Sequence, residues 1–97
     1  MPRPDFSELA ENDYIGIFDF GVERFGLEQA ITYQFGMDEL LDTLGDSPLS
    51  HQQVGESQRF RRAVYKSHAI YFEIAANDRV KILRIIGRQA FAKPFSR

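Results

Sequence analysis

Apolar side chains recur at steps of three and four along the first part of the chain. They are Ala10, Tyr14, Ile17, Phe18 and Phe25. This spacing places them on one face of an amphipathic helix. Ser7 is suited to cap the start of that helix, and Gly26 is suited to end it. The pattern predicts a first helix over about residues 7–25.

A second run with helical spacing begins at Leu27. Its apolar positions are Ala30, Tyr33, Met37, Leu40, Leu41 and Leu44, and Gly45 and Pro48 follow them. We therefore expect a second helix over about residues 28–44, and a link of one or two residues makes the two helices an antiparallel hairpin over 7–45. Gly36 costs the second helix about 1 kcal/mol relative to Ala, so we expect it to allow close packing against the first helix or a strand.

The period of the pattern changes to two after a polar loop at residues 46–57. Alternating runs at 58–65, 68–74 and 80–86 predict three strands, and Asn77-Asp78 marks a turn. Such short links make an antiparallel β-meander over residues 58–87. Residues 2–6 contain two prolines, which edge strands tolerate, so they are a candidate fourth strand.

The predicted fold class is α+β, with an N-terminal antiparallel helix hairpin packed on a three- to four-stranded antiparallel sheet. A chain of 97 residues fits a single domain, 1–97. Two paths are open for the C-terminal tail at 88–97, which contains Phe91 and Phe95: it runs back along the sheet, or it stays mobile.

Charge is divided unevenly along the chain. Residues 1–56 carry two Lys/Arg and twelve Asp/Glu, a balance of −10, whereas residues 57–97 carry ten Lys/Arg and two Asp/Glu, a balance of +8. Such asymmetry favours a charged partner for the basic half. The alternative is that the two halves complement each other within one fold.

Composition removes several kinds of chemistry. The chain has no Cys, and its two histidines, His51 and His68, do not stand at metal-ligand spacing, so we expect no disulfide, metal or cofactor. No apolar run approaches the roughly 20 residues of a membrane helix, and the first residues lack a signal-peptide core, so we expect a cytoplasmic protein. No pattern of carboxylates indicates a catalytic pair, and His68 is expected to be structural.

The strands carry the basic residues Arg59, Arg61, Arg62, Lys66, Lys81, Arg84 and Arg88. We expect a binding surface formed mainly by Arg61, Arg62, Arg84 and Arg88, with Lys81 and Lys66 at its periphery. Strand alternation places Arg62 with Phe60 and Val64, and Arg84 with Ile82 and Ile86. An Arg on an apolar face needs a partner or a ligand. An internal ion pair of Arg84 with Glu73 or a helix carboxylate is therefore an open alternative.

Several segments together resemble the ParE toxins of the RelE/ParE superfamily. Residues 13–20 with 23–26 are similar to the family's first helix, and 26–30 with Tyr33 to the opening of its second helix. Residues 59–62 and 67–72 resemble its central strand pair, and 80–86 its last strand. The resemblance covers about residues 5–90. Lys66 and Gly87 depart from it, because many members have Gly before the Ser-His pair and His after the last strand.

The resemblance implies a toxin of a type II toxin–antitoxin system that is neutralised by a ParD-like antitoxin in a hetero-oligomer. It also implies DNA gyrase as the target, with growth arrest, plasmid stabilisation and no catalysis. We expect the antitoxin segment to be helical and acidic, competing with the target for the arginines. Two alternatives stay open: a ribosome-dependent mRNA endonuclease of the RelE branch, and a non-toxic binding module. The tail after Arg88 lacks the Tyr of the RelE branch, which argues against nuclease activity.

Overall fold

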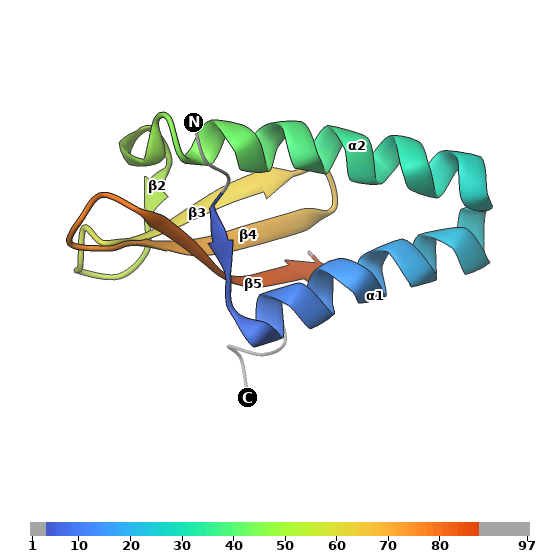
Figure 1. The fold of residues 1–97 in the computed structure, drawn as a ribbon, viewed down its shortest axis with the longest axis horizontal. Helices are drawn as coiled ribbons and strands as arrows, with labels where there is room; N and C mark the ends of the chain where they lie inside the picture. The colour runs from blue at the N-terminus through green and yellow to red at the C-terminus, as the bar shows by residue number, and fades with distance from the viewer. Residues whose placement is uncertain (1–3, 88–97) are drawn as a thin grey trace.

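A computed structural model describes residues 4–87, so the predictions for residues 88–97 lie outside the described part of the chain. Helix α1 spans Glu8–Phe25 and α2 spans Leu27–Leu44, as the periodicity predicted. Ser7 caps α1 by accepting from the Ala10 amide at 3.0 Å, and its hydroxyl also donates to the Leu83 carbonyl at 2.8 Å. Gly26 has φ of 96°, which favours glycine, and it turns the chain directly into α2. The antiparallel hairpin is confirmed (Figure 1).

The sheet contains the predicted meander, with β3 at Phe60–Tyr65, β4 at His68–Ile74 and β5 at Val80–Gly87. Two short strands extend it: β1 at Asp5–Phe6 and β2 at Gln52–Gln53, giving the order β1-β5-β4-β3-β2. The sheet therefore has five strands rather than three or four. All its pairings are antiparallel except that of β1 with β5, which is parallel. The two helices and three strands that lie between β1 and β5 in the chain provide the long connection that a parallel pair needs.

Strand β2 lies inside the segment expected to be only a polar loop, after a 3-10 turn at Pro48–Ser50. Both of its side chains are exposed, so no apolar alternation marks it in the sequence. Backbone pairing defines the strand instead, with Gln52 opposite Arg62 and Gln53 opposite Arg61.

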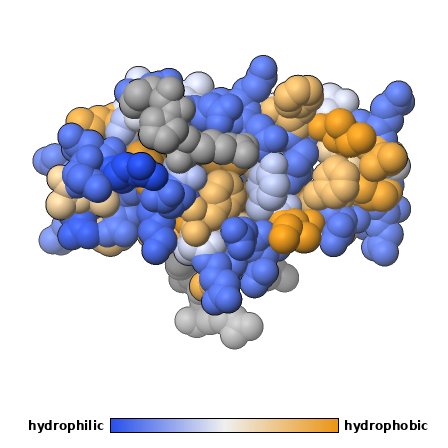
Figure 2. Space-filling view, viewed as in Figure 1, coloured by the Kyte–Doolittle hydropathy of each residue, from blue (hydrophilic) through white to orange (hydrophobic). Residues whose placement is uncertain are grey.

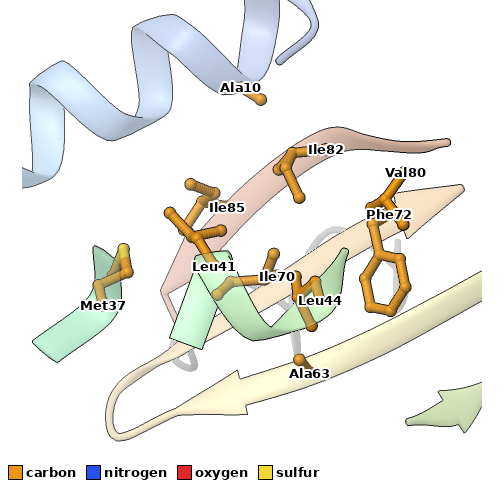
Figure 3. Close-up of a cluster of buried hydrophobic side chains, with 10 residues drawn as sticks. All are labelled: Ala10, Met37, Leu41, Leu44, Ala63, Ile70, Phe72, Val80, Ile82 and Ile85. Carbon is orange, nitrogen blue, oxygen red and sulfur yellow. The ribbon is translucent and has the colours of Figure 1, made fainter. Parts of the chain in front are cut away.

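The core lies between one face of the sheet and the hairpin, which makes a two-layer α+β domain. Its fully buried side chains include Met37 and Leu41 from α2, Ile70 and Phe72 from β4, and Ile82 from β5 (Figure 3). Burying a side chain of this size contributes roughly 1.5–3 kcal/mol. The packing of these side chains determines which face of the sheet the helices cover.

A bulge in β5 changes the predicted alternation of that strand. Tyr71 stands opposite Arg84 but Phe72 stands opposite Ile82, so Leu83 is the extra residue. Ile85 is consequently buried, while Arg84 is not on the face of Ile82. The expectation that Arg84 interrupts a buried apolar face is therefore wrong.

Gly36 allows a strand side chain to approach α2, one of the two predicted roles. A Cβ atom at this position would overlap the hydroxyl group of Tyr65 on β3. The Tyr65 ring in turn packs edge-on against the Tyr33 ring, with centroids 5.0 Å apart. The glycine thus seats the end of β3 against the middle of α2.

Candidate target-binding surface

The sheet face turned away from the helices carries Arg62, flanked along β3 by Phe60 and Val64, which are 38% and 46% exposed. We call this the open sheet face. The register places Arg62, Tyr71 and Arg84 in one row across β3, β4 and β5. Phe60, Glu73 and Lys81 form the neighbouring row. The two rows therefore contain three cations, two aromatic residues and one carboxylate, Glu73, over three strands.

Arg62 is partly buried on this face. One terminal nitrogen of its guanidinium donates to the side-chain oxygen of Gln52 at 2.8 Å. Its Nε is buried and has no hydrogen-bond partner within residues 4–87. A buried donor without a partner costs free energy, so Arg62 is a group that a ligand oxygen would stabilise.

Arg84 takes part in the internal ion pair that the sequence left open. Its Nε and a terminal nitrogen donate to the two carboxylate oxygens of Asp13 on α1, at 2.7 and 3.0 Å. The same carboxylate accepts from the backbone amide of Ile85 at 3.0 Å. The hydrogen bonds to Asp13 raise the pKa of Arg84 above its usual range. The Arg84 side chain is still 44% exposed, so it borders the open sheet face while anchoring α1.

Arg61 faces the other side of the sheet, because it is the neighbour of Arg62 in an extended strand. Its side chain donates to the carbonyl oxygens of Gln58 at 2.9 Å and His51 at 3.0 Å. These bonds hold the segment that contains β2. The structure therefore does not bring Arg61 and Arg62 together, and Arg61 is placed as a support for the loop.

Two further predicted residues, Lys81 and Lys66, lie near the ends of strands. Lys81 is exposed on β5. Lys66 is exposed in the turn between β3 and β4, with φ of 50°, and its Nζ lies 5.5 Å from the centre of the Tyr65 ring. Arg88 lies outside the described residues. Lys81 belongs to the row of Phe60, whereas Lys66 lies beyond Val64 at the opposite end of β3.

Two other arginines form ion pairs. Arg79 donates to both carboxylate oxygens of Asp5 at 3.0 Å, and Arg59 pairs with Glu73. Asp5 and Arg79 are 74 residues apart, so their contact cannot be predicted from a local sequence pattern. The Asp5–Arg79 pair, like Asp13–Arg84, joins the acidic and the basic half of the chain, so the two halves partly complement each other within the fold.

A second cluster, around Tyr33, was not recognised from the sequence. The Tyr33 hydroxyl lies 2.8 Å from Nδ1 of His68 and accepts from the Ser67 amide at 3.2 Å. Burial lowers the pKa of His68 and raises that of Tyr33, so both groups are kept neutral. The sequence pattern predicted only that Tyr33 lies on a helix face and His68 on a strand. It could not predict their contact, because the two residues are 35 positions apart in the chain.

This pair lines a pocket of about 590 Å³ between the far end of the hairpin and the β3–β4 turn. Its walls are apolar at Ile17, Phe20 and Phe25, and Arg24 also lines it.

Among residues 4–87 no group of His, Asp and Glu side chains is arranged to hold a metal ion. Nor does any helix in that part of the chain have the length and hydropathy of a membrane span.

A helix hairpin on a largely antiparallel sheet, with basic residues on the strands, is the architecture expected for the RelE/ParE superfamily. The family model described as the ParE toxin of the type II toxin-antitoxin system, parDE, matches residues 5–90. The chain belongs to this family. A solved structure of the chromosomal ParDE TA system from P. aeruginosa has the same fold, with a TM-score of 0.76 and 20% identity over 90% of this chain and 96% of that chain. No curated protein matches.

Proposed function

We propose that this toxin inhibits DNA gyrase by binding it through the open sheet face, and thereby blocks replication without doing chemistry itself. The observation that carries the proposal is the partly buried Arg62, whose Nε lacks a partner in residues 4–87. Guanidinium groups bind phosphates and carboxylates through paired hydrogen bonds. The exposed Phe60 and Val64 beside Arg62 add apolar contact area, which is typical of a binding surface.

Membership of a type II toxin family supports the proposal of a ParD-like antitoxin in a toxin–antitoxin hetero-oligomer. An acidic antitoxin segment on the open sheet face would cover Arg62 and Lys81, so neutralisation would be competition with the target. Growth arrest, plasmid stabilisation and action in the cytoplasm belong to the same proposal.

The mRNA endonuclease remains a second candidate because of the hydrogen bond between Tyr33 and His68 beside a pocket. A neutral imidazole can accept a proton during catalysis, and Arg24, which lines the pocket, could contact a phosphate. Within residues 4–87, however, no carboxylate is hydrogen-bonded to His68 to orient it, so the binding function is the better supported.

Two assays run side by side distinguish these functions. Purified chain is titrated into a gyrase supercoiling assay and into a ribosome-programmed mRNA cleavage assay. We expect supercoiling to be inhibited while the mRNA stays intact. Cleaved mRNA with unaffected supercoiling would make the endonuclease correct, and no effect in either assay would favour a binding module with another partner.

A further inference from the structure

We propose that the side of the helix hairpin turned away from the sheet is a second docking surface, and that it takes a basic amphipathic helix of a partner protein. We call it the outer hairpin face. Its large apolar side chains are 49–68% exposed: Ile15, Leu27, Ile31 and Phe35. Figure 2 shows hydrophobic side chains gathered over the end of the hairpin where α1 passes into α2. Contiguous exposed apolar surface marks an interaction site.

Helix geometry explains why α2 contributes a stripe to this face. Leu27, Ile31 and Phe35 are four residues apart and therefore lie along one side of the helix. The sheet side of α2 is taken by Met37 and Leu41, which are fully buried. The exposed stripe thus has no contact with the core.

The neighbouring side of α2 is taken by α1. The side-chain amide of Gln34 donates to the Tyr14 carbonyl at 3.0 Å, and the Tyr14 hydroxyl donates to Asp38 at 2.5 Å. Tyr14 and Ile17 also pack against the core, so Ile15, between them in sequence, points away from the sheet. The outer hairpin face therefore has apolar side chains on both helices, along the seam where they meet.

Charge identifies the occupant. Five Asp/Glu lie in α1 and four in α2, against a single Arg, Arg24. Arg24 lines the pocket beside His68, on the sheet side of the hairpin. Among the acidic residues, Glu11, Asp19, Glu23 and Glu28 are exposed. An apolar stripe surrounded by acidic residues is complementary, in polarity and in charge, to a helix whose apolar face is flanked by Lys and Arg.

The same charges argue against a second copy of this chain as the occupant. A two-fold dimer through the outer hairpin face would bring each acidic rim against its own equivalent. Like charges across an interface are repulsive. A partner with the opposite charge has no such cost.

The two surfaces lie on opposite sides of the molecule, because the core separates the hairpin from the open sheet face (Figures 1 and 3). An acidic antitoxin segment suits the open sheet face, whereas the outer hairpin face requires a basic one. Both can be occupied at once, so this inference does not depend on what the toxin inhibits.

Binding of designed peptides to the full chain tests the proposal. The probe is a labelled 21-residue helical peptide with a Leu stripe flanked by Lys, and the control peptide has the same stripe flanked by Glu. We expect the Lys peptide alone to bind, and its affinity to fall at higher salt. Ile31→Lys and Phe35→Lys should weaken binding at least tenfold. Leu49→Lys, the same kind of change at an exposed apolar residue outside this face, should leave it unchanged.

Three results would overturn the proposal. The first is no binding of the Lys peptide, and the second is equal binding of the Glu peptide or equal weakening by Leu49→Lys. The third is a concentration-dependent dimer of the chain, seen by sedimentation and abolished by Ile31→Lys, because the occupant would then be a second copy. None of these readouts involves gyrase, so the proposed function can fail or stand independently.

Discussion

The carboxylate of Asp13 on α1 binds the edge of β5 twice, through the guanidinium of Arg84 and through the backbone amide of Ile85. Strand β1 pairs only with Lys81 and Ile82 of β5, so it does not cover this part of the edge. A helix carboxylate therefore satisfies a strand donor that β1 does not reach, and the ion pair fixes α1 against the sheet.

Removing Asp13 should cost more stability than removing Arg84. Asp13→Ala leaves the Ile85 amide without its acceptor, which costs about 1–3 kcal/mol. Arg84→Ala loses only a half-exposed ion pair, and such pairs contribute about 0–1 kcal/mol. Urea denaturation of both variants measures the difference in free energy of unfolding. Equal losses would show that the backbone bond to Asp13 contributes nothing.

Replacing Gly36 should destabilise the protein through Tyr65. In Gly36→Ala the new methyl group overlaps the Tyr65 hydroxyl, and we expect a loss of about 1–3 kcal/mol. Gly16→Ala is the matched control, because its Cβ meets nothing within 4 Å and Ala favours a helix by about 1 kcal/mol.

The clash has a specific remedy. Adding Tyr65→Phe to Gly36→Ala removes the overlapping hydroxyl and should recover part of the lost stability. If Gly36→Ala were as stable as Gly16→Ala in thermal melts, the close approach of β3 to α2 would be wrong.

The sequence predicted those elements whose pattern is local. Both helices follow from their apolar spacing with Ser7, Gly26 and Gly45 as ends, and the meander follows from alternation. The bulge at Leu83 leaves no such trace, because it depends on the pairing of β4 with β5. Strand β2 also could not be predicted from alternation of apolar and polar residues, since its two glutamines are both exposed.

The candidate site was predicted less well, for a related reason. The sequence pattern predicted that the basic residues lie on the strands. The role of each basic residue depends on the groups that it contacts, and these are known only from the structure. Asp13 and Arg84 are 71 residues apart, and Tyr33 and His68 are 35 apart, so neither contact can be read from spacing. Arg61 and Arg62 were expected on one surface, yet they lie on opposite faces of β3.

Stability should fall on mild acidification because of the histidines. Burial lowers the pKa of His68 and of His51 in the folded state. Near and below about pH 6.5 these two histidines therefore bind more protons in the unfolded chain than in the folded one, which favours unfolding. The free energy of unfolding should therefore decrease from pH 7.5 to 5.5. His68→Gln should flatten this dependence, and His51→Gln should remove part of what remains. An unchanged slope in His68→Gln would contradict a buried neutral imidazole.

The central claim is that Arg62 on the open sheet face contacts the target, and supercoiling inhibition by single variants tests it most directly. Arg62→Ala should raise the inhibitory concentration at least tenfold while changing stability by less than about 1 kcal/mol. Arg79→Ala is the control, because that arginine pairs with Asp5 at the β1 edge. It should inhibit gyrase like the wild type. Full inhibition by Arg62→Ala, or an equal loss in Arg79→Ala, would contradict the account.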